Sequence, residues 1–102
     1  MINFRQYPNL TKIVIPDKIT LTNNNFSNAF KDMKNLTSSP FNHPNITNMS
    51  FTYHNCTNLT GNPVCGSNVT DMHATYYECR NLAGSPVCGN KVTNMIGTYY
   101  DC

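Results

Sequence analysis

The chain has 102 residues, of which 39% are hydrophobic and only 12% charged, and its formal net charge is +2. This length permits one small domain, and the absence of Lys and Arg between Asn35 and Cys79 excludes the clustered cations that a nucleic-acid partner requires. No apolar run is long enough to cross a bilayer, and the opening residues lack the pattern of a signal peptide.

The dipeptide Asn-Leu recurs along the chain at a nearly constant spacing. It begins at Asn9, Asn35, Asn58 and Asn81, and the last two intervals are identical. A short period of this kind is typical of one supersecondary unit per repeat, with successive units stacked. The sequence therefore predicts a single solenoid domain over 1–102. Its rungs are expected at about 1–18, 19–45, 46–68 and 69–91, with a partial rung at 92–102.

The first two rungs are degenerate copies of the later ones. The first fits the repeat at Leu10 and Ile15. The second carries apolar residues where the later rungs have Met, Tyr and Cys, namely Phe26, Phe30 and Met33. Both rungs keep the apolar character of the repeat, so that we expect them to stack with the others.

The third rung, 46–68, contains a helical pattern. Met49, Tyr53 and Cys56 stand at i, i+4 and i+7, which places them on one face of a helix of about two turns. Thr47 precedes them as an expected N-cap. So short a helix is unstable alone, so that its apolar face must be covered by neighbouring rungs.

An extended piece follows each predicted helix. In the third rung it lies around Val64 and Cys65, and Gly66 supplies the bend toward the next rung. A short strand and a short helix in each rung predict an α/β repeat fold, a leucine-rich-repeat-like solenoid of about four rungs, each of roughly 23–26 residues.

The fourth and fifth rungs repeat these positions at the same period. Predicted core residues at the Met, Tyr and Cys positions are Met72, Tyr76, Cys79, Met95, Tyr99 and Cys102, with the expected N-caps at Thr70 and Thr93. Apolar side chains at helical spacing usually pack inward. The next residue in each rung, His54, Tyr77 or Tyr100, should point elsewhere. This row is a candidate binding surface, and packing against the preceding loop is its alternative.

Two stretches carry a resemblance to a known repeat family. "LTKIVIPDKIT" followed by "FSNAFKDMKNLTSSPF" resembles the BspA-like leucine-rich repeat, and "ITNMSFTYHNCTNL" and "VTDMHATYYECRNL" look like related surface-protein repeats. The resemblance covers nearly the whole chain. It implies an extracellular, cell-surface or virion protein that binds proteins or glycans, and such repeats also occur in phage tail and fibre proteins. The second cysteine of each rung, in "PVCG", departs from the family pattern.

The five cysteines follow the repeat. Cys56, Cys79 and Cys102 share one repeat position, and Cys65 and Cys88 share another. No C-x-x-C pair exists, so the sequence gives no support for a zinc site. A catalytic cysteine needs a specific base, whereas His43, His54 and His73 occupy three different repeat positions. Since the five acidic residues are scattered as well, we expect no enzymatic activity, no cofactor and no metal.

The cysteines are either buried thiols or disulfides. Pairing is open between Cys56–Cys65 with Cys79–Cys88 inside rungs, Cys65–Cys79 with Cys88–Cys102 between rungs, and equivalent cysteines on adjacent rungs. In the degenerate second rung both positions are lost together, as Met33 and Asn42. This joint loss favours pairing within a rung.

The sequence therefore favours a non-enzymatic binding or adhesion module with a protein or glycan partner on a host or cell surface. An architectural spacer or self-stacking filament or fibre subunit is the alternative. The last rung ends at Cys102 without a polar cap, and an uncapped end invites stacking with another chain. A homo-oligomer through this end is the expected assembly.

Overall fold

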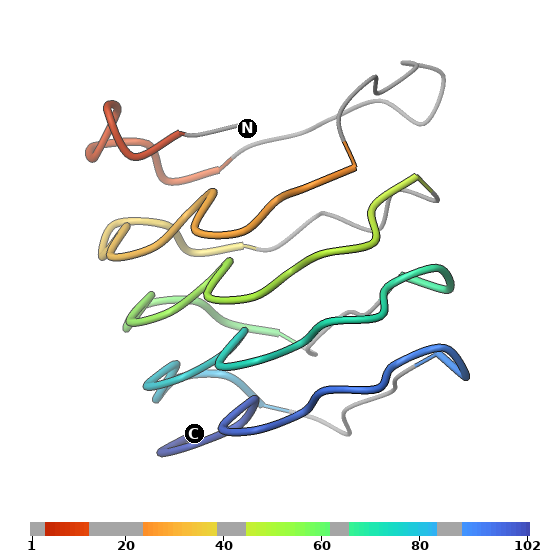
Figure 1. Ribbon diagram of the computed structural model, residues 1–102. Coiled ribbons are helices and arrows are strands. Elements are labelled where there is room, and N and C mark those ends of the chain that lie inside the picture. Colours follow the sequence, from red (N-terminus) through yellow and green to blue (C-terminus); the bar gives the residue numbers. More distant parts are fainter. Residues whose placement is uncertain (1–3, 13–23, 39–44, 62–65, 84–88) are drawn as a thin grey trace.

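Successive repeats lie on top of one another as coils of the chain (Figure 1). The computed structural model describes residues 4–12, 24–38, 45–61, 66–83 and 89–102, which we call coils 1 to 5. Coil 1 and coil 5 form the two opposite ends of the stack in Figure 1. With principal extents of 27 × 26 × 20 Å, the molecule is as wide as it is long, so that each end face is a large part of its surface.

The predicted helices are wrong: no helix is present among the residues that the structure describes. The segments expected to be helical contain left-handed residues, at a non-glycine φ of 57° for Phe51 and 61° for Asn55 in coil 3. An α-helix requires a negative φ throughout. The expectation of an α/β leucine-rich-repeat-like solenoid is therefore overturned. No described helix is long and apolar enough to span a membrane either.

Overlapping turns replace the predicted helix. In coil 3 the backbone N–H groups of Thr52, His54 and Cys56 donate to the carbonyls three residues earlier, at 3.1–3.2 Å. Left-handed residues recur at two positions four residues apart in each of coils 2 to 5: Asn28 and Asp32, Phe51 and Asn55, Ala74 and Glu78, Gly97 and Asp101. The turns thus keep apolar residues on one side at near-helical spacing without forming a helix.

The remaining N–H groups of this segment pair with the next coil, and this explains why turns are preferred. Met49, Phe51 and Tyr53 each donate to a carbonyl of coil 4 at 2.9 Å, and Asn55 does so at 2.7 Å. Ser50 N–H donates to its neighbour's side chain, Asn48 Oδ1, at 2.9 Å. All N–H groups from 49 to 56 are therefore satisfied, half of them by another coil, which a helix would not allow.

Strand-like pairing in the described residues is limited to isolated parallel bridges. They are Asn25↔Asn48, Asn48↔Asp71, Asp71↔Asn94 and Ser38↔Thr60. The expected N-cap Thr70 lies beside this row, and its Oγ1 donates to the carbonyl of Thr47 in the preceding coil at 3.2 Å. The expected strand at Val64 and Cys65 lies outside the described residues.

The predicted core positions are buried in the middle coils. Met49, Tyr53 and Cys56 are 0–2% exposed, and the same holds for the equivalent residues Phe26, Phe30, Met33, Met72, Tyr76 and Cys79. In coil 5 the prediction fails at Met95, which is 44% exposed, and at Cys102, which is also exposed, because no described coil covers them.

A column of stacked rings runs through this core. It joins Phe4, Phe30, Tyr53, Tyr76 and Tyr99, one from each coil. Successive centroids are 5.0, 5.2, 5.4 and 5.7 Å apart and the planes are within 12° of parallel. We call this set the inner column. Because each ring contacts the next, the column fixes the register of one coil on another.

Candidate functional site

The structure brings the predicted surface row together as a second ring column. The His54 and Tyr77 ring centroids lie 4.7 Å apart at an interplanar angle of 5°, and those of Tyr77 and Tyr100 lie 4.7 Å apart at 11°. Each of these residues directly follows an inner-column ring, and the left-handed residue after it turns the chain. We call His54, Tyr77 and Tyr100 the outer column.

The outer column is accessible mainly at its edges. The side chain of His54 is 21% exposed, Tyr77 is half-buried and Tyr100 is 60% exposed. Since parallel rings at 4.7 Å cover one another's faces, neither face of Tyr77 is open to a ligand. A sugar ring that stacks on an aromatic face has no place on Tyr77, and among these three residues it would have to use the face of Tyr100 that is turned away from Tyr77. Groups that contact ring edges and phenol hydroxyls are accommodated along the column.

Carboxylates line the next position along the chain. Asp32, Glu78 and Asp101 occupy equivalent places in coils 2, 4 and 5, and we call them the acidic row. Asn55 stands between them in coil 3 and its Nδ2 donates to Asp32 Oδ1 at 3.1 Å. Arg80 pairs with Asp101 at 3.0 Å and with Glu78 at 3.4 Å. The hydrogen bond to Asp101 raises the pKa of Arg80, with the charges of both carboxylates adding to it.

His54 is held neutral at the start of the outer column. Partial burial lowers its pKa, and the nearby Lys31 cation lowers it further, while Asp32 and Glu78 oppose the shift. Its Nδ1 lies 4.0 Å from Asp32 Oδ1 and has no hydrogen-bond partner among the described residues. A neutral imidazole in this place packs as a flat ring rather than as a cation.

Tyr77 keeps its phenol proton in the physiological range. Desolvation raises its pKa, as do the neighbouring Tyr100 and the carboxylates Glu78 and Asp101. The outer column therefore presents neutral hydroxyls beside a row of negative charge. This combination suits a partner that offers hydrogen-bonding and basic groups.

The cysteines at the inner position form a ladder of thiol–carbonyl contacts. Sγ of Cys56, Cys79 and Cys102 each lies 3.0 Å from a carbonyl oxygen of the preceding coil, that of Phe30, Tyr53 and Tyr76 respectively. These three thiols are free. Cys65 and Cys88 lie outside the described residues. Since Cys56 and Cys79 are free in the structure, the disulfides Cys56–Cys65 and Cys79–Cys88 are not formed in it and stay a prediction for the oxidised protein.

Buried threonines, which are absent from the predicted sites, make the same kind of bond to the preceding coil four residues before each cysteine. Thr52, Thr75 and Thr98 are 0–2% exposed, and their hydroxyls donate to the carbonyls of Phe26, Met49 and Met72 at 2.6–2.9 Å. The sequence does contain a pattern that could have identified these threonines, since Thr precedes the inner-column tyrosine in three consecutive rungs. A buried hydroxyl at a fixed repeat position requires a fixed acceptor.

We expect the thiols to differ in reactivity according to their depth. Burial raises the pKa of Cys56 to about 12 and also raises the pKa of Cys79 and of Cys102, but only Cys102 is exposed. Iodoacetamide at pH 8, followed by peptide mass spectrometry, should therefore label Cys102 well before the other two. Equal alkylation rates at the three cysteines would contradict the burial of Cys56 and Cys79. Labelling of Cys56 only after reduction would show that Cys56 is not a free thiol.

The same raised pKa values set an alkaline limit to stability. A thiol whose pKa is higher in the folded chain favours folding fully below its ordinary pKa of 9.0, and this contribution is lost as the pH rises toward about 12. The midpoint of denaturant unfolding, measured across this range, should fall with pH. A variant with Ser at Cys56 is the control for this titration.

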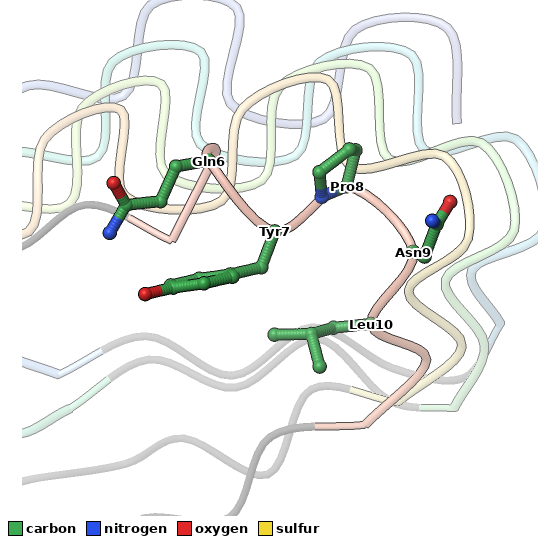
Figure 2. Close-up of a pocket in the computed structure, with 5 residues that line it drawn as sticks. All are labelled: Gln6, Tyr7, Pro8, Asn9 and Leu10. Carbon is green, nitrogen blue, oxygen red and sulfur yellow. The ribbon is translucent and has the colours of Figure 1, made fainter.

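A separate hollow of about 340 Å³ lies at the other end of the stack, in coil 1. It is lined by Gln6, Tyr7, Pro8, Asn9 and Leu10 (Figure 2). Figure 2 shows the Tyr7 ring and the Leu10 side chain extending to the same side of the chain. No acid, histidine or cysteine lines it, and the described residues contain no cluster of three potential metal ligands. The hollow therefore combines the Tyr7 ring and the apolar Pro8 and Leu10 with the amides of Gln6 and Asn9.

Comparison of the chain with protein-family models, curated proteins and solved structures finds no match.

Proposed function

We propose that the chain is a non-enzymatic binding module that recognises a protein partner through the outer column and the acidic row. The observation that carries this proposal is the parallel stacking of His54, Tyr77 and Tyr100 at 4.7 Å on the surface. The core does not need these rings, since the inner column already fills it. Aromatic groups on a surface, in fixed positions, are what interface hot spots are made of.

The chemistry of the site favours a basic protein segment over a glycan. The stack covers both faces of Tyr77 and so reduces the surface on which sugars stack, while hydroxyls and carboxylates remain exposed at the column's edge. Asp32 is opposite no described Lys or Arg at salt-bridge distance, and only Arg80 neutralises Glu78 and Asp101. A Lys- or Arg-bearing partner would add the missing positive charge. The repeat resemblance supports placing this module on a cell or virion surface.

Removal of the Tyr77 ring, the central ring of the outer column, should weaken partner binding. Tyr77→Ala takes away the ring that contacts both His54 and Tyr100, so that binding to the best of a set of immobilised basic peptides and matrix proteins should weaken about tenfold or more. Surface plasmon resonance measures the loss. Glu78→Gln should weaken the same contact and make it less dependent on salt.

Tyr7→Ala is the matched control, because Tyr7 is an exposed tyrosine at the far end of the stack. It should leave partner binding unchanged. If no basic peptide and no matrix protein bound the chain, the proposal would be contradicted. So would tight binding of a neutral glycan that Glu78→Gln leaves intact, since that outcome assigns the surface to sugars.

A second candidate function is architectural, as a unit of a longer stack. It is favoured by the repeated contact between coils, in which four N–H groups of coil 3 donate to coil 4 at 2.7–2.9 Å and one ring of each coil stacks on a ring of the next. This candidate does not depend on the outer column.

A further inference from the structure

Two tyrosines of neighbouring coils lie face to face on the outside of the stack. The ring centroids of Tyr77 and Tyr100 are 4.7 Å apart and their planes differ by 11°. Coils 4 and 5, which carry these rings, run side by side along the chain's path (Figure 1). Contact between two phenols is the geometric requirement of oxidative phenol coupling, in which a carbon–carbon bond joins the two rings.

Backbone hydrogen bonds on both sides of this pair hold its two rings in register. Tyr76 N–H donates to the carbonyl of Thr98, and Glu78 N–H donates to the carbonyl of Tyr100, both at 2.8 Å. These bonds tie the two coils together immediately before and immediately after the Tyr77 ring. The two phenols are therefore already together before they react, and a step between them is effectively unimolecular.

Solvent reaches both rings of the pair. Tyr77 has a ring on each of its faces, His54 on one and Tyr100 on the other, and yet it is only half-buried. Its exposed surface therefore lies outside the ring faces, along the edge of the column. Tyr100 is 60% exposed. The edge of a phenol ring carries the hydroxyl and the ortho carbons, which are the atoms that take part in coupling.

We propose that Tyr77 and Tyr100 are a site of oxidative cross-linking, at which a haem peroxidase with hydrogen peroxide joins coil 4 to coil 5 through a dityrosine. Each phenol gives up one electron and one proton. One molecule of hydrogen peroxide takes up both electrons and both protons and becomes two molecules of water. The two phenoxyl radicals combine at their ortho carbons, and the hydrogen on each of these carbons then moves through solvent to the phenol oxygen, so that both rings are aromatic again.

This inference goes beyond the proposed binding function and does not rest on it. The two tyrosines have to be in contact and open to an oxidant, whether or not a basic partner binds beside them. The product would be a covalent bond between two coils that hydrogen bonds and ring contacts otherwise hold together.

The inner column contains stacked tyrosines that should not react. Tyr53 and Tyr76 lie 5.4 Å apart at 4°, and Tyr76 and Tyr99 lie 5.7 Å apart at 3°. Tyr53 and Tyr76 are completely buried, and close packing around them prevents the pivot that brings two ortho carbons to bonding distance. An exposed side chain such as Tyr100 makes such a movement within about picoseconds to nanoseconds. Exposure therefore selects the outer pair.

The test is treatment of the whole chain with a haem peroxidase and hydrogen peroxide, after its accessible thiols have been blocked with iodoacetamide. Blocking is needed because the exposed thiol of Cys102 would give its hydrogen to a phenoxyl radical. We expect a product of monomer size, 11.5 kDa, that has lost two hydrogen atoms and shows the blue fluorescence of dityrosine. Peptide mass spectrometry should find Tyr77 linked to Tyr100, with a yield that dilution of the protein does not change.

Phenylalanine variants identify the reacting pair and keep a ring at every position. Tyr77→Phe and Tyr100→Phe each remove one phenol, so that either should lower the yield of dityrosine within one chain about tenfold or more. Tyr99→Phe is the matched control, since it removes a phenol of the inner column, where Phe30 already occupies the equivalent position. It should leave the yield unchanged. Tyr7→Phe removes an exposed tyrosine of coil 1 and should reduce only the links between separate chains.

Three results would overturn the proposal while leaving partner binding by the outer column intact. One is the absence of dityrosine in a chain that circular dichroism shows to be folded. Another is dityrosine found only between chains, with a yield that falls on dilution. The third is an equal loss of yield in Tyr77→Phe and Tyr99→Phe, which would show that the reaction is not specific to the outer pair. Conversely, a chain that forms the cross-link but binds no basic partner would contradict the binding function alone.

Discussion

Tyr76→Ala should cost about 4 kcal/mol of unfolding free energy, the range measured for deletion of large buried aromatic side chains. Tyr76 is completely buried and contacts rings on both faces, Tyr53 at 5.4 Å and Tyr99 at 5.7 Å. Removing it leaves a cavity in the middle of the inner column and breaks the ring contacts that join coil 4 to coils 3 and 5. Because a domain of this size has a stability of about 5–15 kcal/mol, urea unfolding should show a large shift of the midpoint.

Tyr100→Ala is the control for this prediction. Tyr100 is also a stacked tyrosine, with its ring 4.7 Å from Tyr77, but it is 60% exposed. Its removal should cost about 1 kcal/mol or less, since exposed contacts contribute little burial. Equal losses for the two variants would show that the inner column is no more important for stability than the outer one.

The repeat register was predictable because identical side chains recur at one period. The Tyr53, Tyr76 and Tyr99 series and the Cys56, Cys79 and Cys102 series keep the same constant spacing. Stacking of equivalent residues then follows from the repetition alone, and the structure confirms it for the rings and for the ladder of thiols. Periodicity says which residues are neighbours, and this inference needs no knowledge of the backbone.

The backbone conformation between these residues was not predictable from the same pattern. A spacing of i, i+4 and i+7 is shared by a helix and by the overlapping turns of Met49, Tyr53 and Cys56. A helix and overlapping turns differ in the carbonyls to which the backbone N–H groups donate. In the turns half of these N–H groups donate to another coil, and a local sequence pattern does not reveal that pairing. The residues at one left-handed position, Asp32, Asn55, Glu78 and Asp101, gave a partial signal, since Asp and Asn tolerate positive φ.

The candidate site was predictable in its membership but not in its chemistry. The sequence placed His54, Tyr77 and Tyr100 in one surface row, and the structure brings them together. Whether their faces or their edges are open depends on the distance between coils, which sequence does not contain. At 4.7 Å both faces of the central Tyr77 are covered, and this spacing is what favours a protein partner over a glycan in our proposal.

Ala74→Gly distinguishes turns from a helix by the sign of its effect on stability. Ala74 has a φ of 52°, a conformation that costs an L-residue about 1–2 kcal/mol relative to glycine's freedom there. Glycine removes this strain and loses about 0.5–1 kcal/mol of backbone entropy, so that the variant should be neutral or more stable by up to about 1 kcal/mol. In a helix the same change would destabilise by about 1 kcal/mol.

Ala74→Val should lower the unfolding free energy by about 2 kcal/mol, because a β-branched residue resists positive φ and Ala74 is buried. Ala29 supplies the control, since it is buried without a positive φ, and Ala29→Gly should destabilise by about 0.4–1 kcal/mol because glycine gives the unfolded chain more conformational freedom. Urea unfolding should show that Ala29→Gly lowers the unfolding free energy whereas Ala74→Gly does not. This difference requires a left-handed residue at position 74 and not at position 29. If both glycine variants lowered the unfolding free energy equally, the result would support the helix that the spacing of the apolar residues predicts.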